Sequence, residues 1–193
     1  MLQPWDFGLV FGLAILAVYV AGVGGFLPVG AFLLGKGKPE AVGVQTFFTG
    51  LFQFLCLAFL FAIAMTITDP ALVGVQTLYT VVALNVAVLS IIWMSLGITL
   101  MRGWALGSMG VHLLASVLVF LVLAVWWAWN APIIGTGGYL TAMNASYAIT
   151  VGLTAAFIAG KFKSAKALAY VFIIFGIVTV LIPSMWLFFG LLP

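Results

Sequence analysis

The sequence has very few charged side chains. Only 5% of its 193 residues are Asp, Glu, Lys or Arg, whereas 66% are hydrophobic, and the mean hydropathy is +1.39. A soluble globular domain carries about 25% charged residues. This shortage excludes a water-soluble domain and predicts an all-α protein that spans a membrane several times. The net charge of +3 comes from scattered residues, so we expect no binding to nucleic acid.

Cysteine and acidic residues are also scarce. Cys56 is the single cysteine, which excludes an intramolecular disulfide, and it belongs to no metal-ligand pattern. The acids Asp6, Glu40 and Asp69 all stand at the ends of apolar segments. The sequence offers no acid pair, no nucleophile beside a base and no metal-ligand cluster, so we expect neither enzymatic activity nor a cofactor. Because Asp6 stands where a signal peptide would carry Lys or Arg, we expect the first apolar segment to stay in the protein.

Turn residues and the few charges divide the chain into six apolar segments. Each is long enough to cross a hydrocarbon core as a helix, which takes roughly 20 residues. We place the segments at about 7–34, 42–67, 71–101, 105–130, 138–160 and 167–190. The connections between them are short, which predicts three antiparallel helical hairpins in a single domain, residues 1–193.

The basic residues all fall in the first, third and fifth connections between these segments. They are Lys36, Lys38, Arg102, Lys161, Lys163 and Lys166. Connections on the cytoplasmic side of a membrane carry an excess of Lys and Arg. We therefore predict that these three connections face the cytoplasm and that both termini lie outside.

Neutral polar side chains recur inside the apolar segments. Gln45 and Gln53 are eight residues apart near one stripe of a helix, with Thr49 between them. Amides and hydroxyls can replace part of the hydration of a neutral solute, but they give an ion no compensating charge. Aromatic rings would set the bore of such a passage. We expect the lining of a route for a small neutral solute to include Thr49, Phe52, Gln53, Asn85, Trp93, Asn144 and Tyr147.

Two other interpretations stay open. Intramembrane amides and hydroxyls often only hydrogen-bond between helices, which contributes ~0.6 kcal/mol each. The protein would then be a membrane subunit or scaffold that transports nothing. Alternatively, His112 is the one side chain inside the segments that can exchange protons near neutral pH, and a proton-coupled secondary transporter would use it as a relay.

Six of the seven tryptophans fall near the ends of the predicted segments. Indole rings there commonly form a belt at the interface between membrane and water. These six are Trp5, Trp104, Trp126, Trp127, Trp129 and Trp186. Trp93 is deeper in its segment, so it is the tryptophan that we expect to face a lumen.

Two stretches resemble the family of urea and short-chain amide channels, AmiS/UreI. They read KPEAVGVQTFFTGLFQFLC at 38–56 and VFIIFGIVTVLIPSMWLFFG at 171–190. The second helix of the family resembles residues 47–50, Phe-Phe-Thr-Gly, and its last helix has a Gly followed seven residues later by Pro, as do Gly176 and Pro183. The family's turn between helices 3 and 4 is similar to Arg-Gly-Trp at 102–104.

The resemblance implies a passive channel in each six-helix protomer, periplasmic termini, a bacterial inner membrane and a homo-oligomer, typically a hexamer. The chain departs from the urea channels on the fifth helix, which reads YLTAMNASYAITVGLTAAF and has no tryptophan. The residue before the last-helix Gly, polar or acidic in the family, is Phe175, which joins the candidate pore residues. These departures favour short-chain amides or another small neutral solute over urea.

Overall fold

The computed structural model describes residues 9–68, 73–132 and 137–189, and the regular structure in these ranges is helical throughout. The elements are α1 (Leu9–Val20), η2 (Ala21–Phe26), α2 (Leu27–Leu33), α3 (Pro39–Thr66), α4 (Val73–Arg102), α5 (Gly107–Asn130), α6 (Gly137–Ile158), α7 (Ala165–Phe175), η4 (Gly176–Leu181) and α8 (Ile182–Phe188). The two elements labelled η are π-helical turns.

Six stretches of these helices are long and apolar enough to cross a membrane. They are Ala14–Leu33, Pro39–Thr66, Val73–Arg102, Met109–Asn130, Gly137–Ile158 and Ala165–Trp186. The prediction of an all-α chain with six candidate spans is therefore confirmed. The first span combines α1, η2 and α2, and the sixth combines α7, η4 and α8, so each contains a π turn near its middle.

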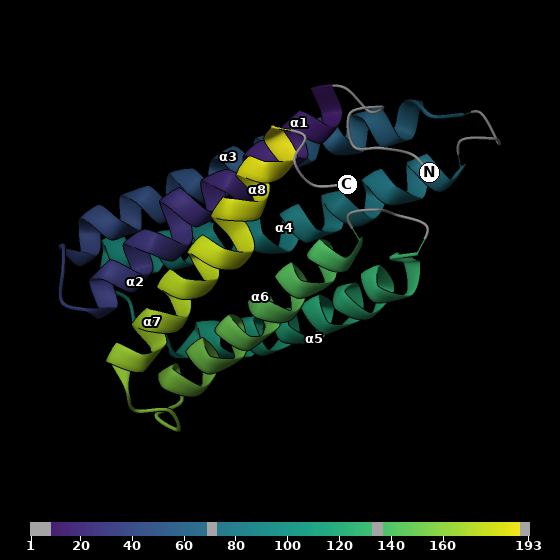
Figure 1. Ribbon diagram of the computed structural model, residues 1–193. Helices are drawn as coiled ribbons and strands as arrows, with labels where there is room; N and C mark the ends of the chain where they lie inside the picture. The colour runs from purple at the N-terminus through teal and green to yellow at the C-terminus, as the bar shows by residue number, and fades with distance from the viewer. Residues whose placement is uncertain (1–8, 69–72, 133–136, 190–193) are drawn as a thin grey trace.

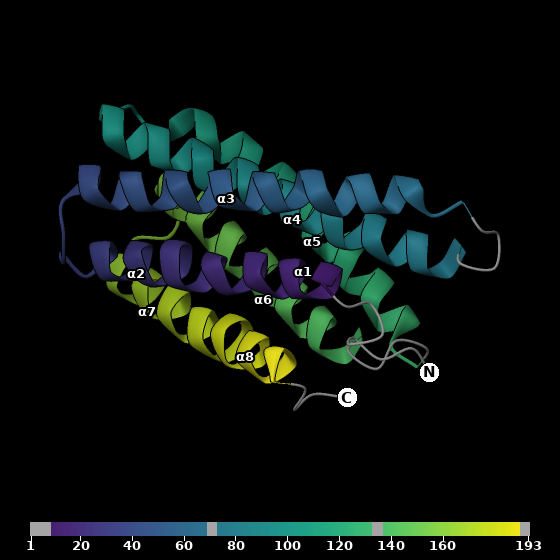
Figure 2. The ribbon, with the colours of Figure 1, turned by 90° about the horizontal axis from the view of Figure 1, so that it is seen from above.

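The spans lie side by side along one long axis (Figures 1 and 2). The closest pairs are α3 with α4, α5 with α6, and the first span with the sixth. Two of these pairs are hairpins of neighbouring spans, as short connections favour, but the prediction of three such hairpins is wrong because the first and sixth spans pair with each other. The third pair joins the beginning and the end of the chain, where α2 packs on α7, η2 on η4 and α1 on α8.

The connections that carry all six basic residues lie at one end of the bundle, called here the basic end (Figures 1 and 2). The side chains of these six residues are exposed. Helix α1 begins and helix α8 ends at the opposite end (Figure 1). The segregation of basic residues inferred from the sequence is thus a property of the folded chain.

Helices α2, α4 and α6 end in the same way at the basic end. Each is followed by a glycine with positive φ: Gly35 at 78°, Gly103 at 61° and Gly160 at 71°. In each case the N–H of the next residue bonds to the carbonyl five residues earlier: Lys36 to Ala31 at 2.9 Å, Trp104 to Thr99 at 3.0 Å and Lys161 to Ala156 at 2.9 Å. This is the Schellman cap, which pairs otherwise free carbonyls and favours glycine because side chains with a Cβ are strained there.

Helices α3 and α4 pack backbone against backbone. A Cβ added to Gly97 would lie 2.5 Å from the Phe47 nitrogen and 2.7 Å from the Gly43 oxygen. Two turns further along, Ser90 Oγ donates a 2.8 Å hydrogen bond to the carbonyl of Gly50. In lipid the hydrophobic effect does not drive helices together, so close packing of the two backbones and hydrogen bonds between helices hold such a pair together instead.

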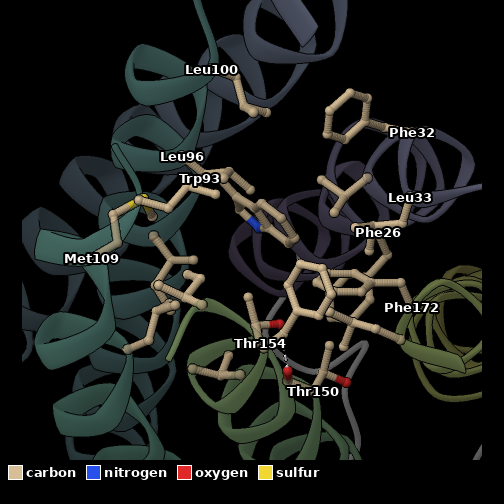
Figure 3. A pocket seen from close by; sticks show the side chains of 18 of the residues that line it. Phe26, Phe32, Leu33, Trp93, Leu96, Leu100, Met109, Thr150, Thr154 and Phe172 are labelled. Atoms are coloured by element: carbon tan, nitrogen blue, oxygen red, sulfur yellow. Dashed lines mark hydrogen bonds between the residues drawn. The ribbon is translucent and has the colours of Figure 1, made fainter. Parts of the chain in front are cut away.

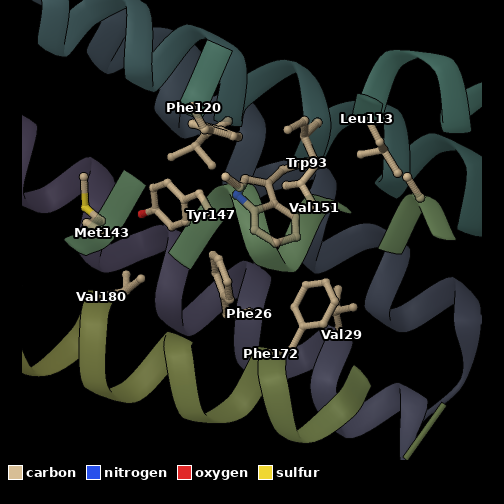
Figure 4. Close-up of a cluster of buried hydrophobic side chains, with 14 of the residues drawn as sticks. Phe26, Val29, Trp93, Leu113, Phe120, Met143, Tyr147, Val151, Phe172 and Val180 are labelled. Atoms are coloured by element: carbon tan, nitrogen blue, oxygen red, sulfur yellow. The ribbon is translucent and has the colours of Figure 1, made fainter. Parts of the chain in front are cut away.

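The main core lies where the first, third, fourth, fifth and sixth spans meet, and Figure 4 shows part of it. It includes Trp127, whose side chain is 0% exposed, so the expectation that this residue belongs to the interfacial belt is wrong. The helical period explains the difference, because Trp127 shares a face of α5 with Phe120 and Leu123. Trp129, two residues on, is 84% exposed.

Candidate functional site

A cavity of about 80 Å³ lies inside the bundle, in the half nearer the basic end (Figure 3). One water needs ~10–15 Å³ of such volume, so the cavity could hold several waters or one small solute. Its lining comes from every span except α3. It reaches from Leu100 and Leu106, beside the third connection, to Trp93 and Tyr147 near the middle of the bundle.

The lining of the cavity carries no charged side chain among the described residues. Apart from Tyr147 and Trp93, its only polar side chains are Thr150 and Thr154. Their hydroxyls donate to carbonyls one turn earlier on the same helix, Thr150 to Ser146 at 2.8 Å and Thr154 to Thr150 at 2.7 Å. Figure 3 shows the second of these bonds. The surface offered to a solute is therefore apolar and aromatic, and it gives an ion nothing to replace its hydration.

Four aromatic rings line the inner end of the cavity, and Figure 4 shows how they lie relative to one another. Phe26 stands at their centre, with its centroid 5.4 Å from Trp93 in an edge-to-face contact, 5.5 Å from Tyr147 in a stacked contact and 5.6 Å from Phe172. These separations fall in the favourable range for aromatic pairs. We call Phe26, Trp93, Tyr147 and Phe172 the aromatic cluster.

Phe26 is held by an unusual stretch of backbone. It is the last residue of the π turn η2, and the π turn η4 packs directly against η2. Pro28 follows η2 by two residues and Pro183 follows η4 by two. A proline inside a helix has no N–H and clashes with the carbonyl one turn earlier, and a wider turn before it relieves that clash. Such π turns occur frequently at functional sites.

Glycines bring the backbone of these π turns against the aromatic cluster. A Cβ added to Gly25 would lie 2.7 Å from the indole ring of Trp93. A Cβ added to Gly176 would lie 2.7 Å from the Cβ of Phe26. Both positions require a residue without a side chain, because the rings occupy the space that a side chain would take.

Of the residues predicted from the sequence, the structure brings Trp93 and Tyr147 together at the inner end of the cavity. Asn144 lies one turn before Tyr147 on α6 and is 0% exposed. Its Nδ2 donates a 2.8 Å bond to the Leu140 carbonyl, while its Oδ1 has no partner among the described residues. Asn85 on α4 is also buried, with Oδ1 unpartnered in the described part of the chain.

The predicted residues on α3 lie apart from the cavity. Gln53 is 1% exposed, and its Nε2 donates a 3.0 Å bond to the carbonyl of Ala17 on the first span. Thr49 packs against Gly24, and Phe52 packs against a second core cluster between α1, α3 and α4. Gln45 is exposed on the outside of the bundle. Thr49 and Gln53 therefore serve contacts between helices in this structure.

Two further candidates also lie outside the lining of the cavity. Phe175 is partly buried, and its carbonyl accepts a 2.8 Å bond from the hydroxyl of Thr179. His112 is partly buried on α5, and its carbonyl accepts a bond from Ser116. Neither side chain faces the cavity.

The central ring of the site, Phe26, was not predicted from the sequence. Phenylalanine is common in the apolar segments of this chain, so its residue type alone did not distinguish Phe26 from the other phenylalanines. A usable signal was the surrounding stretch GVGGFLP at 22–28, because three glycines and a proline around one aromatic residue are unusual for an ordinary lipid-facing helix.

Comparison with known proteins places the fold. No protein-family model matches the chain, and no curated protein sequence matches it. Among solved structures, the crystal structure of the urea channel from the human gastric pathogen Helicobacter pylori superposes with a TM-score of 0.76 at 17% identity, covering 93% of this chain and 99% of that one. The closed-state cryo-EM structure of the H. pylori urea channel gives a TM-score of 0.71 at 16% identity with the same coverage. The resemblance seen in the sequence is therefore confirmed at the level of the fold: the chain folds like a urea channel.

Proposed function

We propose that the protein is a passive membrane channel for a small neutral solute. The observation that carries this proposal is the cavity, which five spans surround with uncharged side chains and which ends at the aromatic cluster. A neutral molecule loses little by entering such a space, whereas an ion loses its hydration without compensation. The shared fold with a urea channel supports the same conclusion.

Short-chain amides fit the lining better than urea. Urea is polar on every edge, and an apolar cavity would leave much of its hydrogen bonding unsatisfied. An amide with one or two alkyl carbons presents an apolar part to the leucines and a planar part that can stack on Trp93. The Trp93 Nε1 has no partner among the described residues, so it can donate to the carbonyl oxygen of the amide.

We further propose that Trp93, Tyr147, Asn144 and Asn85 lie on the solute's route and that the basic end faces the cytoplasm. The exposed apolar residues of α3, such as Phe48, Phe54 and Phe59, would contact lipid or neighbouring copies of the chain in a homo-oligomer. Both partners are expected for a membrane protein with a large apolar surface.

Uptake by proteoliposomes tests the function. Purified protein should carry acetamide or propionamide down a concentration gradient at the same rate with and without a proton uncoupler, because diffusion through a pore consumes no proton gradient. His112→Ala protein should show the same uptake, since His112 does not line the cavity. Loss of uptake in either condition would indicate a proton-coupled transporter, and no uptake by any sample would favour a scaffold.

A further inference from the structure

Two oxygen atoms on α6 are buried without a hydrogen-bond partner among the described residues. They are Oδ1 of Asn144 and the hydroxyl of Tyr147, and both side chains are 0% exposed. More than nine in ten buried polar groups in proteins are paired. Two unpaired oxygens on consecutive turns of one helix can therefore bind a donor that reaches them.

These two atoms lie on the face of α6 that lines the cavity. Residues three or four apart on a helix are neighbours on its surface, so Asn144 and Tyr147 lie next to each other. Tyr147 shares this face of α6 with Val151 and Thr154, and all three line the cavity. Figure 4 shows the hydroxyl of Tyr147 pointing toward Met143, away from Phe172 and Val29. The ring of Tyr147 thus closes the cavity, and its hydroxyl lies on the far side of the aromatic cluster.

Local hydrogen bonds determine what these atoms can bind. The Nδ2 of Asn144 is already bonded to the carbonyl of Leu140. The polar atom of this side chain that has no partner among the described residues is therefore Oδ1, which can only accept a hydrogen bond. The nearby Tyr139 hydroxyl is bonded to the sulfur of Met143 at 3.4 Å. On α4, Asn85 lies one turn before Leu89 of the cavity wall, and its Oδ1 also has no partner among the described residues. The unpaired atoms of Asn144, Tyr147 and Asn85 are all oxygens that can accept a hydrogen bond.

We propose that Asn144 and Tyr147 form a hydrogen-bonding station beyond the aromatic cluster, and that this station selects solutes with an NH2 group over solutes of equal size without N–H. The proposal rests on the function as a channel proposed above. A primary amide matches the station, because its two N–H groups can donate one hydrogen bond to Asn144 Oδ1 and one to the hydroxyl oxygen of Tyr147.

Three isomeric amides provide the test, since propionamide, N-methylacetamide and N,N-dimethylformamide share one formula but carry two, one and no N–H donors. Their fluxes into proteoliposomes are measured by stopped-flow light scattering and corrected for empty liposomes. Wild-type protein should prefer them in the order of their donors. Tyr147→Phe, which keeps the ring on Phe26 and Phe120, should reduce the ratio of propionamide to dimethylformamide flux about fivefold, the usual effect of one hydrogen bond.

Asn144→Leu should reduce the same ratio, and Asn130→Leu is its matched control. Asn130 makes the same bond to the carbonyl one turn earlier, to Trp126 at 2.8 Å, but it lies at the end of α5 outside the site. An unchanged ratio in Tyr147→Phe, or an equal fall for all three isomers, would overturn the station, because a structural role or a bound water does not discriminate between solutes. If wild-type protein carries none of the isomers, the channel itself is wrong.

Discussion

At the scale of single residues, Phe26 has the greatest influence on the proposed passage. Its ring contacts three other rings, and the cavity stops where these rings meet. A chain with 15% aromatic residues has many rings on its lipid-facing surface, but few are fully enclosed. The bore of the proposed passage would therefore depend on where the backbone places one phenylalanine.

Replacing Phe26 with Ala should increase flux several-fold, most for the larger amides, because it removes the ring at the inner end of the cavity. The same change should lower the free energy of unfolding by about 3–5 kcal/mol, which is the usual effect of replacing a buried phenylalanine with alanine. Proteoliposome flux and thermal unfolding in detergent measure the two effects. Phe59→Ala is the control, since Phe59 is 60% exposed on α3 and should alter neither strongly. Unchanged or lower flux would mean that Phe26 does not block the route.

Gln53 provides a second test at this scale, of whether amides on α3 conduct or only join helices. Gln53→Leu loses the bond to Ala17, worth ~0.6 kcal/mol, and also removes a buried oxygen without a described partner. We expect stability to change by less than about 1 kcal/mol and flux to stay within about twofold. A larger fall in flux at normal stability would place Gln53 on the route.

At the scale of elements, the contact between α3 and α4 depends on missing side chains. Backbone atoms of the two helices meet at Gly43, Gly50 and Gly97, so the hairpin has no room for a methyl group there. This contact holds α3 in place although α3 contributes nothing to the cavity. Helix α3 therefore supports the wall of the site from behind.

Gly97→Ala should destabilise the protein strongly, because the new Cβ would lie 2.5 Å from the nitrogen of Phe47. Helix propensity alone would favour alanine by about 1 kcal/mol. Gly74→Ala is the matched control on the same helix, since nothing lies within 4 Å of the added atom, and it should be neutral or slightly stabilising. Thermal unfolding in detergent compares the two. Equal stability of the two variants would show that the helices can separate without cost.

At the scale of the whole molecule, the two ends of the bundle differ in charge. Every Lys and Arg lies at the basic end, which is also the end that the cavity approaches. Positive residues are retained on the cytoplasmic side during insertion, so this charge pattern predicts the orientation. The cavity would then lie on the cytoplasmic side of the aromatic cluster.

The orientation can be tested with a single engineered thiol. In a Cys56→Ala background, Lys163→Cys should resist a membrane-impermeant maleimide in right-side-out vesicles and react with it in inverted ones. Cys56 is the single native cysteine, so this background carries no thiol other than the engineered one. The opposite pattern of labelling would show that the basic end faces outside.

The sequence predicted the spans because lipid allows few alternatives. Runs of apolar residues must form helices, and Gly35, Gly103 and Gly160 mark three of their ends. It did not predict which polar residues face inward. Gln53 and Asn144 are both amides in apolar segments, yet one contacts the first span and the other lies beside the cavity wall, because packing between segments distant in sequence decides their surroundings.

The site itself was predicted in part. Trp93 and Tyr147 were recognised because aromatic and polar groups deep in a span are unusual, and both line the cavity. Phe26 and Phe172 were missed because their position depends on the pairing of the first and sixth spans. These spans are far apart in the sequence, so no short connection predicts that they pair. Trp127 was assigned to the interfacial belt because distance from a helix end does not show which face of the helix a residue occupies.

The two π turns have a consequence for how the passage could open. Each places one more residue in a turn than an α-helix would, so releasing that residue rotates the neighbouring side chains around the helix axis without breaking the span. Phe26 ends one of these turns, and the other packs against it. Phe26 lines the inner end of the cavity and ends a π turn, so a change of register there would turn its ring about the helix axis and alter the opening of the proposed route.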